Sequence, residues 1–199
     1  MDPLTDSPDG NLLTARLRLR SWRDEDAAPM LAMSTDPEVM RHFPRVMTAD
    51  DANAFVARHR ALLAQGRPGL SVVERRADDS FVGFVGLVEQ TFEAPFAPCV
   101  EVGWRLVRSA WGQGFATEAA NEALRHGYDD LGLDEIVSMT AVGNQRSIAV
   151  MRRLGMHTDP SDDFDNPQVP VGHELRRHVL YRLRADEWRG SRSRPMPPG

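Results

Sequence analysis

The chain of 199 residues contains no lysine, so all 24 of its basic residues are arginine. The absence of lysine excludes Schiff-base chemistry on a lysine amine, a lysine general base and a P-loop, whose phosphate cradle needs its Lys. Cys99 is the only cysteine, which excludes an internal disulfide and any metal site made of several cysteines. We expect Cys99 to be a small buried apolar residue, with a nucleophilic thiol as the alternative.

Long apolar runs and basic runs are also missing. No segment approaches the roughly 20 apolar residues of a membrane span, and the first ten residues are acidic where a secretory signal would be basic. The formal net charge is −5, which argues against a nucleic-acid-binding surface and favours a cationic substrate. The six histidines have no metal-binding spacing. We therefore expect a cytoplasmic protein that uses no metal, nucleic acid or membrane.

The length favours one domain, which we place at residues 12–189. Residues 1–11 and 190–199 are rich in polar residues, proline and glycine, and we expect both segments to be disordered. Alternation and helical spacing of apolar residues predict the elements between them. Strands are expected at 13–22, 70–75, 81–89, 99–107, 134–142 and 178–184, and helices at 24–33, 48–66, 116–131 and 145–154. This order indicates an α/β or α+β domain with a mixed sheet.

The run Trp111-Gly112-Gln113-Gly114-Phe115-Ala116-Thr117-Glu118 joins a predicted strand to a predicted helix. One interpretation is a tight turn that binds nothing. A dinucleotide-binding turn is a second, but Thr117 replaces the third glycine of that pattern and no acid ends the following strand. A third is an anion site, because glycines allow close approach of the backbone and a helix N-terminus offers unpaired N–H groups.

Two sequence motifs favour the third interpretation. Residues 111–116 match the pyrophosphate motif Q/R-x-x-G-x-G/A of the GNAT superfamily of acyl-CoA-dependent N-acyltransferases, except that Trp111 takes the first position. Asn144, Ser147 and Leu154-Gly155-Met156 resemble the later motif of that family, N-x-x-(A/S) followed by a helix and L-G-F. The segments 14–22, 101–104 and 111–119 are similar to those of RimJ/RimL-type acetyltransferases, and the resemblance covers about residues 13–188.

The resemblance implies a mixed, mostly antiparallel sheet flanked by helices, with a central pair of strands that splay apart. It implies that acetyl-CoA, the acyl donor, binds without a metal and that an amine attacks the thioester directly in a ternary complex. A homodimer is left open. The residues expected to bind the cofactor are Leu106, Val107, Arg108, Gly112, Gln113, Gly114, Phe115, Ala116, Thr117, Asn144 and Ser147.

Two residues are candidates for proton transfer. Glu101 lies in an otherwise apolar predicted strand and is a candidate general base, or else a strand residue paired with an arginine. The resemblance suggests Ser147 as a partner of the departing thiolate, because Met151 replaces the tyrosine that often serves in GNAT enzymes. Both Asn144 and Ser147 also suit a plain helix start. We expect an N-acetyltransferase acting on a protein N-terminal or small-molecule amine, and the alternative is a non-catalytic acyl-CoA-binding or sensing domain.

The acidic run from Asp162 to Asp165 lacks the glycine and distal glutamate of an EF-hand loop. We expect it to be a solvated loop, and its alternative role is to line the acceptor site and attract a cationic amine.

Overall fold

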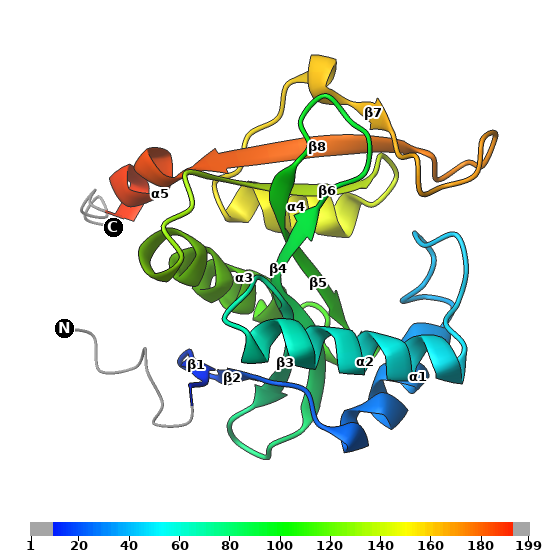
Figure 1. Cartoon of the computed structure of the whole chain (residues 1–199), viewed down its shortest axis with the longest axis vertical. Helices are drawn as coiled ribbons and strands as arrows, with labels where there is room; N and C mark the ends of the chain where they lie inside the picture. Colours follow the sequence, from blue (N-terminus) through cyan, green and yellow to red (C-terminus); the bar gives the residue numbers. More distant parts are fainter. Residues whose placement is uncertain (1–9, 193–199) are drawn as a thin grey trace.

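The computed structural model describes residues 10–192. Its centre is one sheet in the order β1-β2-β3-β4-β5-β6-β8-β7, in which the pair β5–β6 is parallel and every other pair is antiparallel. This confirms the predicted mixed, mostly antiparallel sheet flanked by helices (Figure 1). The strands are β1 (Leu12–Leu13), β2 (Leu17–Arg20), β3 (Leu70–Arg75), β4 (Phe81–Gln90), β5 (Cys99–Leu106), β6 (Glu135–Ala141), β7 (Phe164–Asp165) and β8 (Arg177–Arg184).

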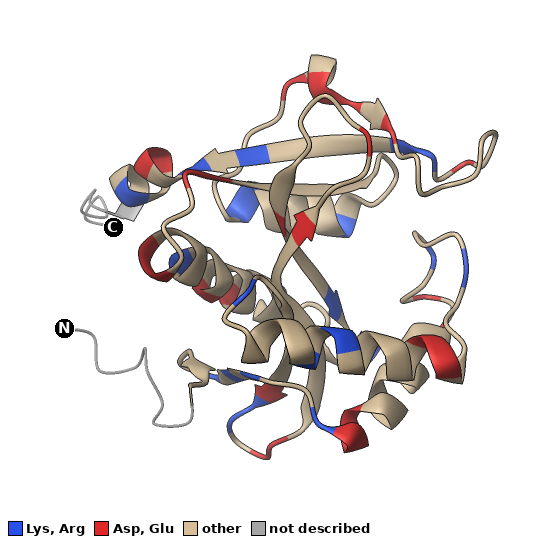
Figure 2. Cartoon of the chain, in the orientation of Figure 1, with Lys and Arg blue, Asp and Glu red and all other residues tan. Residues whose placement is uncertain are grey.

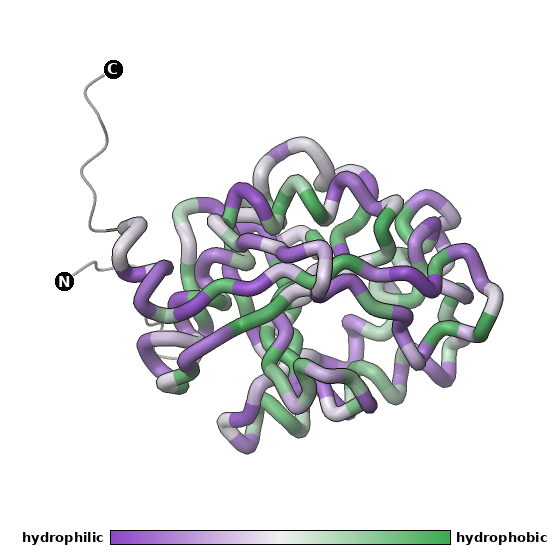
Figure 3. The backbone as a smooth tube through the Cα atoms, turned by 90° about the horizontal axis from the view of Figure 1, so that it is seen from above, coloured by the Kyte–Doolittle hydropathy of each residue, from purple (hydrophilic) through white to green (hydrophobic). Residues whose placement is uncertain are grey.

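Helices cover both faces of the sheet. They are α1 (Ala27–Thr35), α2 (Ala49–Ala64), α3 (Phe115–Arg125), α4 (Gln145–Arg153) and α5 (Ala185–Arg192), with short turns η1 (Asp24–Asp26), η2 (Arg108–Ala110), η3 (His126–Asp130) and η4 (Pro160–Asp162). The strand residues alternate between two cores, one packed against α3 and α4 and the other against α1 and α2. Hydrophobic stretches recur along the strands and helices of the chain trace (Figure 3), and the buried hydrophobic residues of these elements form the cores.

Several predicted boundaries hold, and their physical signals are local. Helix α2 begins after Thr48, whose hydroxyl accepts from the N–H of Asp51 while the Asp51 carboxylate accepts from the N–H of Thr48. The strands expected at 70–75 and 81–89 form the hairpin β3–β4. The helix expected at 145–154 is α4, and Asn144 is its N-cap.

Other expectations need correction. The single strand predicted at 13–22 is two antiparallel strands, because the chain turns at Thr14, whose hydroxyl accepts from the N–H of Leu17. The helix predicted at 24–33 starts as η1, and the one predicted at 116–131 changes at His126 into the π-helical turn η3. Strand β7 and helix α5 were not predicted, and α5 continues to Arg192, beyond the boundary placed at 189. The predicted disordered segments otherwise fall almost entirely outside the described residues.

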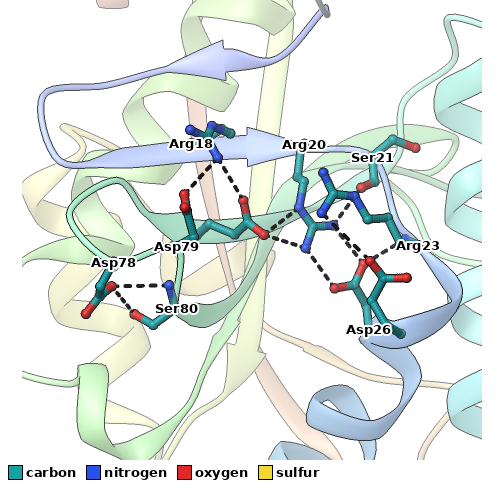
Figure 4. A network of polar contacts seen from close by, with 10 residues as sticks. Arg18, Arg20, Ser21, Arg23, Asp26, Asp78, Asp79 and Ser80 are labelled. Carbon is teal, nitrogen blue, oxygen red and sulfur yellow. Dashed lines mark hydrogen bonds and ion pairs between the residues drawn. The ribbon is translucent and has the colours of Figure 1, made fainter.

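A buried ionic network attaches the first helices to the sheet (Figure 4). The guanidinium of Arg20 on β2 donates to Glu74 on β3 at 2.7 Å and to both carboxylate oxygens of Asp26 at 2.7 and 2.8 Å. Because all three side chains are buried, each charge depends on its partners, and loss of one would leave the others uncompensated. The network therefore fixes where α1 starts relative to β2 and β3.

Candidate active site

The glycine-rich turn lies directly before α3. Gly112 and Gly114 have φ of 72° and 79°, the left-handed region that favours glycine, and Gly114 is the N-cap of α3. The first intrahelical hydrogen bond runs from the N–H of Glu118 to the carbonyl of Gly114 at 3.0 Å. The N–H groups of residues 115–117 therefore precede the first helical hydrogen bond and point out of the helix end. A Cβ on Gly112 would meet no heavy atom within 4 Å, so the backbone here is open to a ligand.

A long-range contact braces this turn. Arg16 donates to the carbonyl of Gln113 at 3.0 Å, forms an ion pair with Glu118 at 2.6 Å, and places its Cζ 4.6 Å from the ring centroid of Phe115. Glu118 also accepts from the hydroxyl of Thr14 at 2.6 Å. Sequence reasoning missed Arg16, because about 100 residues separate it from the turn and no local pattern connects them.

Trp111 joins the turn to the start of α4. Its indole N–H donates to the carbonyl of Leu106 at 3.0 Å, and the Cζ of Arg146 lies 4.4 Å from its ring centroid. This distance is within the range of a cation–π contact. Trp111 therefore has a structural role in the position that the family motif gives to Gln or Arg, and it brings the N-termini of α3 and α4 together.

Asn144 and Ser147 form one unit at the start of α4. The amide nitrogen of Asn144 donates to the hydroxyl of Ser147 at 3.0 Å and to that of Thr140 at 2.9 Å, and its amide oxygen accepts from the N–H of Ser147 at 3.3 Å. Because the Ser147 hydroxyl oxygen accepts from Asn144, its own proton is directed elsewhere.

Strands β5 and β6 separate beyond Glu101. In the described chain, the register of this parallel pair consists of Glu101 opposite Val137. The N–H of Val107 donates to the carbonyl of Val82 on the β4 side at 3.0 Å, and backbone groups alternate in direction along a strand. The N–H groups of Trp104 and Leu106 therefore face the β6 side, past the point where β6 pairs. In Val107, expected to bind the cofactor, the N–H is bonded to Val82 and the carbonyl accepts from the N–H of Ala110 at 3.0 Å, so its side chain is the group left for that role.

The carboxylate of Glu101 lies at this point of separation. It accepts from the side-chain amide of Gln90 at 2.6 Å and from the backbone N–H of Met139. Burial outweighs these two hydrogen bonds and raises the pKa of Glu101 to about 7. A carboxyl group with a pKa near neutrality can both take up and release a proton at physiological pH. No arginine is among its partners in the described chain, so the predicted alternative of a simple ion pair is wrong.

The remaining candidate residues are less specific. Arg108 is exposed in η2. Burial raises the pKa of the Cys99 thiol to about 11, which opposes a nucleophilic role at neutral pH. The acidic run lies at the top of Figure 2, and two of its carboxylates form ion pairs with strand β8. An oxygen of Asp162 lies 2.8 Å from Nε of Arg182, and an oxygen of Asp165 lies 3.5 Å from Nη1 of Arg177.

Two kinds of feature are absent from residues 10–192. This part of the chain has no cluster of three His, Cys, Asp or Glu side chains suited to a metal ion. None of its helices has the length and apolar character needed to cross a bilayer.

Comparison with known proteins agrees with this geometry. Residues 16–157 match the model of the acetyltransferase (GNAT) domain family. The chain is 34% identical over 187 residues to the FsC-acetyl coenzyme A-N(2)-transacetylase of Aspergillus fumigatus, covering 89% of this chain and 77% of that protein. It is 27% identical over 179 residues to YnaD of Bacillus subtilis, described as an uncharacterized N-acetyltransferase, covering 89% and 99%. A crystal structure of a GNAT-family acetyltransferase from Bacillus anthracis superimposes with a TM-score of 0.73 at 23% identity, covering 89% and 99%. The chain belongs to the GNAT family of N-acetyltransferases.

Proposed function

We propose that the chain transfers the acetyl group of acetyl-CoA to a primary amine, and that the turn 112–117 binds the pyrophosphate of the donor. The observation that carries this proposal is the start of α3, where two glycines with positive φ lead into a helix end that has unpaired N–H groups. Such a helix end attracts anions through its N–H groups and its dipole. Arg108, exposed and close to the turn in sequence, is a further phosphate ligand in this proposal.

The pantetheine arm is proposed to enter where β5 and β6 separate. The N–H groups of Trp104 and Leu106 face this space and would hold the amides of the arm or the thioester oxygen. Backbone donors aimed at a developing oxyanion contribute a few kcal/mol to catalysis. Asn144, near the end of β6, would contact the arm while it caps α4.

The proposed reaction is a direct acyl transfer. The neutral amine attacks the thioester carbonyl, a tetrahedral intermediate forms, and its collapse breaks the carbon–sulfur bond. Glu101 takes the amine proton, directly or through water. The Ser147 hydroxyl donates a hydrogen bond to the departing thiolate, in place of the tyrosine that Met151 replaces.

The acceptor is proposed to be an α-amino group, of a protein N-terminus or of a small molecule. An α-amino group with a pKa near 7.8 is roughly 10% neutral at pH 7, whereas a lysine amine near 10.4 is roughly 0.04% neutral. A base of pKa about 7 suits the former, which needs less help to lose its proton. The RimJ/RimL resemblance supports a protein N-terminus, and the name of the Aspergillus relative, an N(2)-transacetylase, supports a small molecule.

Release of the thiol of CoA tests this proposal. The protein is incubated with acetyl-CoA and separate acceptors: peptides with a free N-terminus, N-terminally blocked lysine peptides, polyamines and amino acid derivatives. We expect thiol release above the rate of acetyl-CoA hydrolysis with at least one α-amino acceptor. Tight acetyl-CoA binding without turnover on any acceptor would instead support the alternative of a sensing domain. Cytoplasmic location and a homodimer stay predictions.

A further inference from the structure

Arg105 lies on β5 four residues after Glu101, on the same face of the strand, because side chains alternate with a period of two. Its register partner Phe84 packs in the core formed with α1 and α2. Val102 and Leu106, at alternate positions of β5, pack in the core formed with α3. Glu101 and Arg105 therefore face the α1/α2 side of the sheet, opposite the side covered by the helix whose start is the proposed pyrophosphate site.

The guanidinium of Arg105 lies within cation–π distance of two aromatic rings. Its Cζ lies 3.9 Å from the ring centroid of Phe43 and 5.3 Å from that of Phe84. Its Nη1 donates to the hydroxyl of Ser34 at 3.1 Å and contacts the sulfur of Met47 at 4.0 Å. These contacts fix the plane of the guanidinium and orient its remaining N–H groups.

This cation has no anion within the described chain. The Nε of Arg105 is buried without a hydrogen-bond partner, and no acidic residue among 10–192 forms an ion pair with it. Arg20, which is buried, shows how such a charge is compensated, since it contacts two carboxylates (Figure 4). Burial lowers the pKa of Arg105 to about 10, so it is still protonated at pH 7. A partly buried positive charge without a counter-ion is unfavourable, and an anionic ligand would satisfy it.

The surroundings of Arg105 add no negative charge. His42, in the loop before α2, also has a buried ring nitrogen, Nδ1, without a partner in the described chain. Burial and the charges of Arg41 and Arg146 lower the pKa of His42. Two orphaned nitrogen atoms, one of them on a cation, therefore occur on the α1/α2 side of a protein whose net charge is −5.

Space for a ligand exists between Arg105 and Glu101. Gly103 lies midway on the same face of β5, and a Cβ on it would meet no heavy atom within 4 Å. Because four residues of strand span about 13 Å, this distance separates the backbone positions of Glu101 and Arg105.

We propose that the acceptor of the acetyl group carries a carboxylate as well as its amine, and that Arg105 binds this carboxylate while the amine lies toward Glu101. This inference rests on the proposed function and specifies its substrate class.

The chemistry of arginine favours a carboxylate as the bound group. The guanidinium is planar and presents its N–H groups in one plane, which matches the two oxygens of a carboxylate. The proposal reverses the expectation from net charge, which favours a cationic substrate. Polyamines, which carry several positive charges, would be repelled by Arg105. Amino acids, short peptides with a free carboxyl end and related amphoteric molecules are the acceptors expected.

Matched acceptors test the inference. Alanyl-alanine and glycyl-glycine are compared with alanyl-alaninamide and glycyl-glycinamide, which keep the α-amine and lose the carboxylate. We expect the wild-type protein to prefer the carboxylates by at least tenfold in kcat/KM. Glutarate, which has no amine, should compete with the acceptor for its site and should not compete with acetyl-CoA. Glutaramide, which lacks both carboxylates, should not inhibit.

The variant Arg105→Gln should lower kcat/KM for the carboxylate acceptors by about tenfold to hundredfold, mainly through KM, and leave the amide acceptors within twofold. Arg184→Gln, at an exposed arginine of β8, is the matched control and should change neither class. An unchanged affinity for CoA shows that the variant is folded. If Arg105→Gln does not fold, the preference of the wild-type protein for carboxylate acceptors and its inhibition by glutarate still test the inference.

Equal use of carboxylates and amides by the wild-type protein, without inhibition by glutarate, overturns the inference and leaves the proposed function intact. Absence of thiol release with every amine, of either class, overturns the proposed function itself.

Discussion

Glu101 of β5 lies opposite Val137 of β6 at the one register pair that joins these parallel strands within the described chain. The position is special for two reasons. Strand β5 pairs with β4 along its whole length, whereas its register with β6 is confined to this position, so sheet structure holds the carboxylate at the edge of the gap between β5 and β6. The same burial that comes with this position raises its pKa to about 7.

Replacing Glu101 by Gln should change the dependence of activity on pH. With a free amino acid as acceptor, whose α-amino group has a pKa above 9, formation of the neutral amine alone makes log kcat/KM rise with pH with a slope of one. In the wild-type protein, ionisation of Glu101 adds a second unit of slope below pH 7, so the slope should change from two to one near pH 7. The variant should show a slope of one throughout, with a loss of about hundredfold at pH 8 and a much smaller loss at pH 5.5.

The profile is measured from pH 5.5 to 8.5 with acetyl-CoA held constant. A variant that keeps the change of slope near pH 7 would remove Glu101 from the proton-transfer step. Gln90→Leu is a useful companion, since it removes the hydrogen bond that lowers the pKa of Glu101 and should move the change of slope to higher pH.

Two substitutions at Gly114 separate charge from backbone strain at the proposed pyrophosphate site. Asp and Asn have the same shape and both tolerate the left-handed conformation that Gly114 adopts at φ of 79°. Either should suit a helix N-cap. Only Asp places a negative charge where the pyrophosphate is proposed to bind, so Gly114→Asp should bind CoA at least tenfold more weakly than Gly114→Asn. Isothermal titration measures both, and equal affinities would contradict the proposed location.

Much of this site could be predicted because its signals are local. The glycine pattern before α3, the Asn144 cap and the Thr48 capping box each depend on residues within one turn of one another, and local geometry determines what they do. The π-helical turn at His126 could not be predicted, because the apolar spacing continues through it without interruption.

The rest of the site depends on contacts between distant segments. Arg16 contacts the glycine-rich turn although about 100 residues of sequence separate them. The surroundings of Arg105 likewise come from distant segments, since Phe43 and Ser34 contact it only in the folded protein. In the sequence, Arg105 is one arginine among 24 and has no distinguishing neighbour. The burial that raises the pKa of Glu101 is likewise a property of the folded sheet. Spacing alone therefore locates the glycine-rich turn proposed to bind the cofactor, and it does not reveal the charges around Arg105 and Glu101.

Ser147→Ala tests the proposed partner of the thiolate. The cap of α4 should persist, because the backbone N–H at 147 still donates to Asn144. We expect kcat to fall about tenfold, consistent with loss of a hydrogen bond to a charged group, while the affinity for CoA changes less than twofold. Single-turnover measurements separate acyl transfer from product release. An unchanged rate of acyl transfer would leave Ser147 with its capping role alone.

His59 of α2 should make the protein sensitive to acid. The side chain is buried, its Nδ1 accepts from the N–H of Leu70 at 3.2 Å, and burial lowers its pKa to about 4. The unfolded chain binds the proton at a reference pKa of 6.5 and the folded protein does not, so the folded state loses stability as the pH falls from 6.5 to 4. The shift of about 2.5 pKa units corresponds to a loss of as much as about 3 kcal/mol in the free energy of unfolding.

Urea unfolding at pH 7 and pH 4.5 measures this effect. His59→Gln, whose amide can still accept from Leu70, should lose less stability on acidification than the wild-type protein. Phe55→Leu is the control, because it removes a ring whose centroid lies 4.3 Å from that of the His59 ring and leaves the titrating group in place. It should lower stability by a similar amount at both pH values. An equal dependence on pH in the wild-type protein and His59→Gln would show that the acid sensitivity arises from other groups.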